Sequence, residues 1–362
     1  MSRRRRDADS PTVQDVEFVE VDDEPDGTLP EPAAAPGLRK PVQQIIQSDS
    51  SHDSGLDSSS DLISDSDDDD GFIAVAESQS ETTDRISSAR RRARYDLPPG
   101  PPLQKGRARV VTVTNQKGGV GKTTTVINLA AQLALNGHRV LIVDCDAQGN
   151  CATGLGVDKS RVEVGTREMV LAPERAVDAR HATAVDGLHL VVGDRSLVGL
   201  EEELASHLGR ERRLAEAIAP LRPHYDIILI DTPPALGLMT VNALVASDAV
   251  LIPVQTEYLA LEGLALLAGS LREVRRLLNH RLGVDGVMLT MHAPTLLNQQ
   301  VAAEIRESFP DLVVEPPIRR NIKLAEAPSQ GVPIHLHAPN SKGGEDHFEL
   351  AKNLSERWGL EG

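Results

Sequence analysis

The stretch Val111-Thr112-Val113-Thr114-Asn115-Gln116-Lys117-Gly118-Gly119-Val120-Gly121-Lys122-Thr123-Thr124 decides the fold of this chain. Its first residues are apolar or β-branched, as in a buried strand, and its last residues open a helix. The glycine-rich turn between them would present successive backbone N–H groups to an anion, and the helix N-terminus would add partial positive charge. The stretch therefore predicts a phosphate-binding loop between a strand and a helix.

Two side chains of this loop carry its chemistry. Lys122 would reach the β- and γ-phosphates of a nucleotide, and the hydroxyl group of Thr123 would hold Mg²⁺. The usual phosphate loop has a glycine five residues before its last glycine, where this chain has Gln116. A second lysine, Lys117, follows and opens the run K-G-G-V-G-K-T-T.

This departure resembles the deviant Walker A motif of the ParA/MinD superfamily, and the chain is similar to ParA/Soj-type chromosome-partitioning ATPases over residues 107–357. In that family the early lysine crosses a dimer interface to the partner's phosphates. The resemblance implies ATP hydrolysis with Lys117 and Lys122 as catalytic residues. It also implies that the whole loop binds the nucleotide, through Lys117, Gly118, Gly119, Val120, Gly121, Lys122, Thr123 and Thr124.

Two acidic motifs follow later strands. Asp144 and Asp146 lie in L-I-V-D-C-D-A-Q-G-N (141–150), which resembles switch I of the family, although Ala147 stands where the family commonly has proline. Asp231 ends the apolar run I-I-L-I-D like a Walker B aspartate, and D-T-P-P resembles switch II. The resemblance implies that Asp146 orients the attacking water as a third catalytic residue. It also implies a Mg²⁺ site made by Thr123, Asp144 and Asp231, whereas simple capping of the next turns by the aspartates is the alternative.

The segment P-I-R-R-N-I-K-L-A-E-A-P-S-Q-G (317–331) resembles the family signature P-R-N-V-R-L-x-E-A-P-S-x-G. In the family this segment binds DNA without regard to sequence and lies near the adenine of the nucleotide. The resemblance therefore implies DNA contacts by Arg319, Arg320 and Lys323. It implies base contacts by Ala327 and Pro328.

Two other features bear on DNA binding. Arg275 and Arg276 lie near the end of an expected helix, where they either face DNA or form a solvated face that complements the helix dipole. The family usually has an arginine in the loop where this chain has H-A-P-T-L-L-N (292–298). Either His292 and arginines of the N-terminal tail compensate, or DNA binding is weaker than in the family.

Short apolar segments alternate with amphipathic ones from Arg109 onward. Apolar strands bounded by Gly, Pro or Asp are typical of a parallel sheet that is covered on both faces. The predicted fold class is a doubly wound α/β domain with a mostly parallel sheet, helices on both faces and ligands at the carboxyl ends of the strands. Strands are expected over 110–114, 140–144, 188–192, 227–230, 249–254 and 284–290, and helices over 123–136, 201–219, 259–280 and 300–309.

Composition divides the chain at residue 105. Residues 1–105 hold 12 Lys and Arg against 23 Asp and Glu, which gives −11 of the total formal charge of −16. Such a segment buries too little apolar surface to offset its ordering entropy. We therefore expect a disordered acidic tail and linker over 1–105 and a ParA-type ATPase domain over 106–362. The tail would cover the basic face and compete with DNA, add DNA contacts through its arginines, or improve solubility.

The leading hypothesis is an ATPase that forms an ATP-dependent homodimer, binds DNA non-specifically and segregates chromosome or plasmid DNA with a ParB-type partner. ATP and Mg²⁺ are the implied cofactors, and the expected location is cytoplasmic and nucleoid-associated, without membrane contact. A MinD-like or cargo-positioning ATPase on a membrane or protein surface is the alternative. An iron–sulfur carrier is disfavoured because Cys145 and Cys151 lack ligand spacing, and a binding adaptor on an inactive fold is disfavoured by the intact motifs.

Overall fold

The computed structural model describes residues 98–360. Residues 1–97, which make up most of the predicted acidic tail, lie outside this range. The role expected for that tail therefore stays a prediction. Among the described residues, none of the helices combines the length and the apolar character that crossing a lipid bilayer requires.

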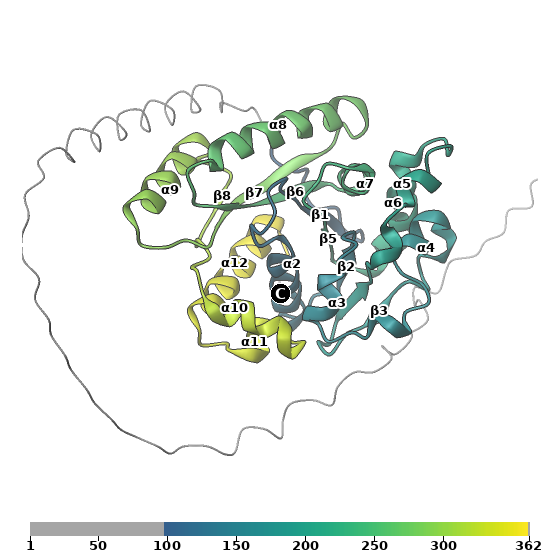
Figure 1. The fold of residues 1–362 in the computed structure, drawn as a ribbon, viewed down its shortest axis with the longest axis horizontal. Coiled ribbons are helices and arrows are strands. Elements are labelled where there is room, and N and C mark those ends of the chain that lie inside the picture. The colour runs from purple at the N-terminus through teal and green to yellow at the C-terminus, as the bar shows by residue number, and fades with distance from the viewer. Residues whose placement is uncertain (1–97, 361–362) are drawn as a thin grey trace, which may run out of the picture. The chain divides into compact units, whose positions relative to one another are not determined.

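An eight-stranded sheet forms the centre of the described part of the chain, in the order β3-β4-β2-β5-β1-β6-β7-β8 (Figure 1). Neighbouring strands are parallel, except that β3 pairs antiparallel with β4. The predicted doubly wound, mostly parallel sheet is therefore confirmed. The strands are β1 (Arg109–Val113), β2 (Val140–Asp144), β3 (His181–Ala182), β4 (Leu188–Val191), β5 (Ile227–Asp231), β6 (Ala249–Gln255), β7 (Gly283–Thr290) and β8 (Val313–Val314).

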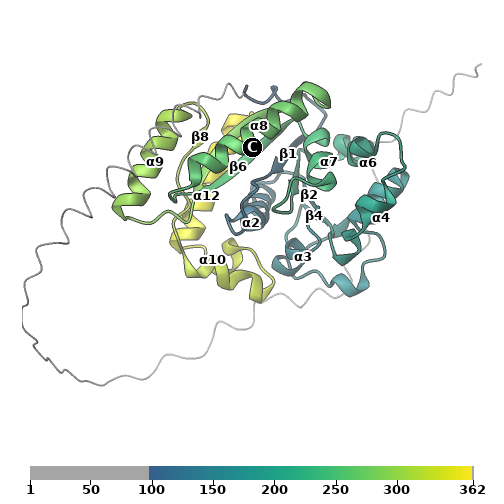
Figure 2. The ribbon, with the colours of Figure 1, turned by 45° about the horizontal axis from the view of Figure 1, so that its top comes forward.

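Helices cover both faces of this sheet, as the two views of Figures 1 and 2 show. Helices α2 and α12 share a buried cluster with one face, whereas α4, α6 and α7 cover the central strands on the other face. Helices α8 and α9 pack on β6 and β7. The helices are α2 (Lys122–Leu135), α3 (Asn150–Gly154), α4 (Thr166–Leu171), α5 (Leu200–Glu203), α6 (Arg213–Ile218), α7 (Leu238–Ala246), α8 (Ala260–Leu277), α9 (Leu296–Ser308), α10 (Ile322–Glu326), α11 (Ile334–His337) and α12 (Lys342–Trp358).

The strand sequences are apolar throughout because both faces are covered. Val111 and Val113 of β1 point into the cluster of α2 and α12, and Val110 points into the cluster on the opposite face. All three side chains are fully buried. Burying each such side chain stabilises the fold by about 1.5–3 kcal/mol, so a polar residue at any of these positions would be strongly unfavourable.

One expected helix, over residues 201–219, is wrong as a continuous element. The structure has the short helix α5, then turns, a 3₁₀ turn at Arg210–Arg212 and finally α6. Gly209 adopts a left-handed conformation with φ 71°, and the side chain of Leu208 is fully exposed. Helix α5 has already ended at Glu203, and Gly209 lacks the right-handed φ angle that a continuous helix would need. The antiparallel strand β3 and the long helix α12 were not predicted.

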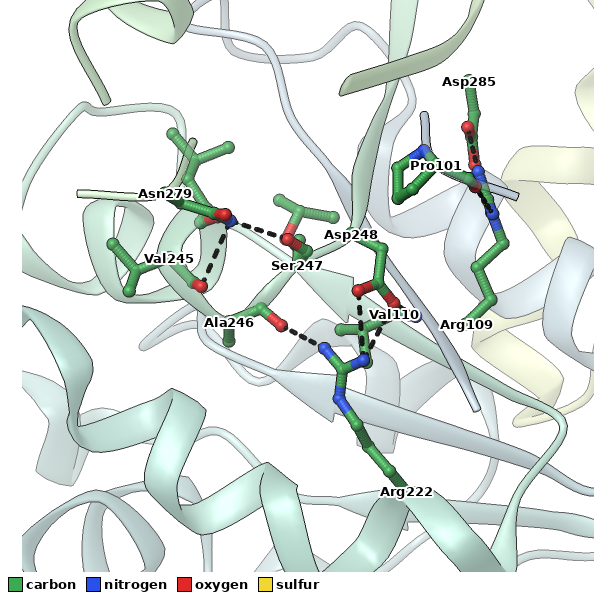
Figure 3. A network of polar contacts seen from close by, with 12 residues as sticks. Pro101, Arg109, Val110, Arg222, Val245, Ala246, Ser247, Asp248, Asn279 and Asp285 are labelled. Atoms are coloured by element: carbon green, nitrogen blue, oxygen red, sulfur yellow. Dashed lines mark hydrogen bonds and ion pairs between the residues drawn. The ribbon is translucent and has the colours of Figure 1, made fainter. Parts of the chain in front are cut away.

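The amino-terminal edge of the sheet is closed by a network of buried polar contacts (Figure 3). Arg109 at the start of β1 donates to both carboxylate oxygens of Asp285 in β7, at 2.7 and 2.5 Å. The same guanidinium group donates to the carbonyl oxygen of Pro101, and the N–H of Val284 donates to the carbonyl oxygen of Pro98. Residues 98–101, which we expected to belong to the linker, therefore lie against the sheet edge.

Candidate functional site

The site lies where β1, β2 and β5 end. Asp231 of β5 is in register with Val113 of β1 on one side and with Asp144 of β2 on the other. The glycine-rich loop leaves β1 at this same edge and leads into α2. The carboxyl ends of three neighbouring parallel strands therefore bring together the loop and the two aspartates that the sequence predicted to act together.

Backbone conformation explains the glycines of the loop. Gly119 and Gly121 have φ angles of 74° and 90°, which side chains with a Cβ rarely adopt. A Cβ atom built on either residue would have no atom within 4 Å. Glycine is therefore required by the left-handed backbone conformation and not by lack of space for a side chain. The space next to these two residues is open to an anion.

Contacts from neighbouring strands hold the loop in place. The side-chain oxygen of Asn115 accepts a hydrogen bond from the N–H of Lys117 at 3.0 Å, and its amide nitrogen donates to the carbonyl oxygen of Pro253 at 2.8 Å. The hydroxyl group of Thr290, at the end of β7, donates to the carbonyl oxygen of Val120 at 2.9 Å. The loop is therefore preorganised by β6 and β7, and its backbone N–H groups need little rearrangement to meet a ligand.

Lys122 is the buried lysine of the loop. Its side chain is 7% exposed and lies on the first turn of α2. Burial lowers its pKa, although the charges of Asp231 and Asp146 partly oppose this shift. An ammonium group taken out of water gains from an anionic partner, so Lys122 is placed to bind phosphate oxygens.

Lys117 lies on the exposed side of the same loop. Its ammonium group forms an ion pair with Glu257, which follows β6, and both side chains are about half exposed, at 50% and 51%. The two lysines, which are five residues apart, therefore differ in their surroundings. The side chain of Lys122 is buried beneath the loop, whereas the side chain of Lys117 is exposed to solvent. A role of Lys117 across a dimer interface stays a prediction.

The predicted metal ligands come together. The hydroxyl group of Thr123 donates to Oδ2 of Asp231 at 2.6 Å, which leaves the hydroxyl lone pairs for a cation. Asp144 accepts the N–H groups of Asp146 and Cys151 at 3.0 and 3.1 Å. The side chains of Asp144 and Asp231 are fully buried.

The positive charge of Lys122 compensates the buried carboxylate of Asp231 only in part. Burial, together with the charge of Asp231, raises the pKa of Asp144 to about 8. Burial and the charge of Asp146 raise the pKa of Asp231 to about 6, against the hydrogen bond from Thr123. Oδ1 of Asp231 is buried and has no hydrogen-bond partner in the described part of the chain. Hydroxyl and carboxylate oxygens are the donors that Mg²⁺ prefers, so the residues present fit this ion.

Asp146 lies in the turn after β2 and is partly exposed. Its carboxylate accepts the N–H of Gln148 at 3.0 Å, and its carbonyl oxygen accepts the N–H of Gly149. One carboxylate oxygen therefore caps the turn, as the alternative interpretation proposed. Its charge nevertheless acts on both Lys122 and Asp231, which places Asp146 beside the loop.

The residues predicted to contact the base lie in the 3₁₀ turn Ala327–Gln330, which packs against α3. The Ala327 side chain is buried, whereas Pro328 is partly exposed. Of these two residues, Pro328 presents side-chain surface to a ligand, and their contacts with a base stay a prediction.

The five residues predicted to bind DNA do not form one surface. His292, just after the end of β7, pairs with Arg319 through the backbone. Arg320 and Lys323 come directly after Arg319, so they lie at the sheet edge that carries the phosphate loop. Arg275 and Arg276 lie at the end of α8, which runs from the carboxyl end of β6 back to the start of β7. They therefore lie at the opposite edge of the sheet.

The three basic residues at the sheet edge that carries the phosphate loop differ in their ion-pair partners. Arg319 donates to both carboxylate oxygens of Asp346, with distances of 2.6–3.0 Å, and to Glu345 at 3.1 Å. Lys323 pairs with Glu326 of its own short helix at 2.8 Å. The side chain of Arg320 is exposed, and no ion pair to it is found within residues 98–360. Arg320 therefore has the most available charge, whereas Arg319 links the segment to α12.

Sequence reasoning missed three contributors. Cys151 lies 3.6 Å from Oδ2 of Asp231 through its sulfur, Glu257 pairs with Lys117, and Asp346 pairs with Arg319. Glu257 lies 140 positions after Lys117, and nothing in its local pattern shows that it meets the loop. Both cysteines are free and buried, and Cys151 lies among carboxylates, an arrangement that does not favour an iron–sulfur site.

Comparisons with known proteins agree with this geometry. A family model described as an AAA domain matches residues 108–284. The sporulation initiation inhibitor protein Soj of Bacillus subtilis is 47% identical over 248 residues, which are 68% of this chain and 98% of that protein. The chromosome-partitioning ATPase Soj of Thermus thermophilus is 46% identical over 256 residues, which are 70% of this chain and 98% of that protein.

A solved structure of cobyrinic acid a,c-diamide synthase from Mycobacterium smegmatis, with a bound ATP analogue and magnesium, is also similar. It has a TM-score of 0.61 and 33% identity, and the match covers 70% of this chain and 96% of that one. Two relatives above 45% identity along almost their whole length, together with the doubly wound sheet and the two-lysine loop, lead to one conclusion. This chain belongs to the Soj/ParA family of P-loop ATPases.

Proposed function

We propose that this protein is a partition ATPase that dimerises around ATP, binds DNA without sequence preference and segregates chromosome or plasmid DNA together with a ParB-type partner. The observation that carries the proposal is the difference in burial between two lysines of one loop. Lys122 is buried where its own nucleotide would lie, and Lys117 is exposed where a second subunit could approach. The relative from Thermus thermophilus is itself named a chromosome-partitioning ATPase.

The site supplies what phosphoryl transfer to water requires. The backbone N–H groups of the loop and the ammonium group of Lys122 stabilise charge on the β- and γ-phosphates. Thr123, Asp144 and Asp231 would hold Mg²⁺, which would neutralise further phosphate charge. Asp146, in the turn beside the loop, orients the attacking water. Little covalent chemistry is left for the protein, so catalysis depends on this placement of charges.

The exposed position of Lys117 supports the proposed dimerisation. With its own phosphates held by Lys122, the exposed ammonium group would reach the nucleotide of a second copy facing the same edge. ATP bound at both sites would then join the two subunits, and hydrolysis would release them. Such a cycle is a nucleotide-driven shift between two populations.

DNA binding would use Arg320 and Lys323 of each subunit, because these residues lie at the sheet edge where the two subunits of the proposed dimer would meet. Joining two basic surfaces roughly doubles the phosphate contacts and makes binding cooperative and sensitive to salt. A ParB-type partner would stimulate hydrolysis and release the dimer from DNA. Association with the nucleoid follows from this affinity for DNA.

The test is co-sedimentation of the full chain with DNA of two unrelated sequences, in ATP, in ADP and without nucleotide, at two salt concentrations. We expect ATP-dependent, salt-sensitive binding that is indifferent to sequence. Lys122→Ala should abolish it together with nucleotide binding. Lys117→Ala should keep nucleotide binding and lose the dimer and DNA binding. Normal ATP hydrolysis without any DNA binding would overturn the proposal.

A MinD-like membrane ATPase is the weaker candidate. Helix α12 buries its apolar face, including Leu350, Leu354 and Trp358, in the cluster that it shares with α2. The indole N–H of Trp358 donates to Asp285 at 2.7 Å. An interfacial helix needs an unpartnered apolar face, so α12 is not available for that role. Flotation with liposomes in the presence of ATP should leave the protein in the dense fraction.

A further inference from the structure

A basic hollow lies at the amino-terminal edge of the sheet, beside the end of α8. It has a volume of about 500 Å³, and its lining residues are Pro98, Arg272, Arg275, Arg276 and His280. Every titratable side chain of this lining is basic. Because α8 runs from the carboxyl end of β6 back to the start of β7, the hollow lies at the edge opposite the phosphate loop and is separate from the nucleotide site.

The segment that supplies these arginines has a net positive charge. Over residues 272–281 the chain has four arginines against one glutamate, which gives a formal charge of +3. Arg276 pairs with this glutamate, Glu273, at 2.7 Å. Arg275 donates to the carbonyl oxygen of Leu282 at 2.5 Å, a contact that orients the guanidinium group and leaves its charge in place. A helix end offers roughly half of one negative charge, so the arginines exceed what the dipole of α8 requires.

The described part of the chain begins at the rim of this hollow. The carbonyl oxygen of Pro98 accepts the N–H of Val284 at 2.9 Å, and Pro99 forms a parallel bridge with the same residue. Arg109 donates to the carbonyl oxygen of Pro101 at 2.6 Å (Figure 3). Backbone contacts therefore fix residues 98–101 against β7, and residues 1–97 are joined to the domain directly beside the arginines.

The sequence before Pro98 contains an anionic counterpart. Residues 61–70, D-L-I-S-D-S-D-D-D-D, have six aspartates and no basic residue, which gives a formal charge of −6. The nearer run R-R-R-A-R (90–94) has the same sign of charge as the hollow, which excludes it as the occupant. Residues 71–97 separate the acidic run from Pro98, and 27 residues span up to about 90 Å when extended. The acidic run therefore has ample reach to the hollow.

We propose that the acidic run 61–70 docks on the basic hollow of its own domain. Guanidinium groups bind carboxylates through paired, charge-assisted N–H donors. Attachment through the same chain raises the local concentration of the run at the hollow, so modest intrinsic affinity is sufficient. Docking at this edge holds the acidic run away from Arg320 and Lys323, instead of placing it in competition with DNA. It requires neither ATP nor DNA, so it does not rest on the proposed function.

The experiment measures the distance between two spin labels on the full, nucleotide-free chain. One label is attached at Ser66→Cys in the acidic run and the other at Leu277→Cys, a 57% exposed position at the end of α8. Both native cysteines are buried, so the labels react with the introduced thiols. We expect a short-distance population at about 0.05 M salt that is lost at about 0.5 M salt, because salt screens the attraction.

Two pairs of arginine substitutions are compared. Arg272→Gln with Arg276→Gln removes two charges from the hollow, and the short-distance population should be lost. Arg161→Gln with Arg195→Gln removes the same charge from exposed positions outside α8, and the population should be kept.

A second set of variants leaves residues 98–360 unchanged, so it tests docking independently of the stability of the arginine variants. Replacement of Asp67, Asp68, Asp69 and Asp70 by asparagine should abolish the short-distance population. The matched control neutralises four acidic residues elsewhere in the tail, through Asp22→Asn, Asp23→Asn, Glu24→Gln and Asp26→Asn, and should keep it.

Absence of the short-distance population at low salt in the doubly labelled parent would overturn the proposal and leave the hollow to an external anion such as DNA. Equal loss of that population in both arginine pairs would also overturn it. A short distance between two singly labelled chains after mixing would show that the run docks on a second copy, which contradicts docking within one chain. None of these results depends on ATP hydrolysis or DNA binding, so the two proposals fail separately.

Discussion

Lys117 and Glu257 form an ion pair on the exposed side of the phosphate loop, so the lysine that is expected to act on a second subunit is held by its own chain. An exposed pair of this kind contributes about 0.2–1 kcal/mol. In the proposed dimer the lysine would have to leave Glu257 before it reached the other nucleotide, and this free energy would oppose dimerisation.

The first prediction concerns Glu257. Glu257→Gln frees Lys117 in both subunits, so the dimer should form at a lower ATP concentration. Two pairs of up to about 1 kcal/mol each are broken per dimer, so the association constant should rise by up to about thirtyfold. Sedimentation velocity across an ATP series measures this shift. In a Lys117→Ala background the same substitution should have no effect, and a lower association constant in Glu257→Gln alone would contradict the interpretation of the ion pair.

The second prediction concerns pH. The pKa values of Asp144 and Asp231 are raised from an ordinary 3.8 to about 8 and about 6, so both groups bind protons more tightly in the folded than in the unfolded state. The free energy of unfolding of the nucleotide-free protein should therefore fall as pH rises from about 4 to about 8. Thermal unfolding between pH 6 and pH 8.5 measures the slope.

Asp231→Asn separates this effect from general pH sensitivity. The variant removes one of the two coupled carboxyl groups, so its unfolding temperature should depend less on pH and exceed that of the wild type near pH 8. Asp226→Asn is the matched control, because Asp226 precedes the same strand and pairs with Arg139 at a partly exposed position. A pH slope unchanged by Asp231→Asn would show that these carboxyl groups do not control it.

The sequence predicted those parts of the site that local chemistry determines. The loop from Gly118 to Gly121 needs left-handed glycines between a strand and a helix, and consecutive residues of the sequence show this pattern directly. Asp144 and Asp231 end apolar strands, and the parallel sheet then brings both to one edge. The continuous apolar strands were predictable for the same reason, since both faces of the sheet are covered.

Contacts between distant segments left no such local pattern. The pairing of Arg319 with Asp346 joins residues 27 positions apart, and it depends on how α12 packs against the segment after β8. The placement of Arg275 at the opposite sheet edge follows from the direction of α8, and a basic helix end looks the same at either edge. An interruption between Glu203 and Arg213 replaced the helix that periodicity favoured, and it includes Gly209 in a left-handed conformation.

The third prediction gives Arg319 a structural role. Its guanidinium group meets Asp346, whose side chain is 5% exposed, so Arg319→Ala would leave a buried carboxylate without its partner. Because Arg319 itself is 39% exposed, we expect a loss of about 1–3 kcal/mol in the free energy of unfolding, between the cost of breaking an exposed pair and that of breaking a buried one. Urea unfolding of Arg319→Ala, Asp346→Asn and the double variant measures the coupling; additive losses would argue against the pair.

The fourth prediction distinguishes the two groups of arginines. Arg320 is exposed at the loop edge, whereas Arg276 lies at the opposite edge and pairs with Glu273. Arg320→Ala should weaken ATP-dependent DNA binding at all sequences and reduce the slope of log affinity against log salt by about 1 for each phosphate group that the variant no longer neutralises. Arg276→Ala removes the same charge and should leave both quantities within error of the wild type. Equal losses in the two variants would place the DNA path along α8 as well, and would mean that DNA contacts both edges of the sheet.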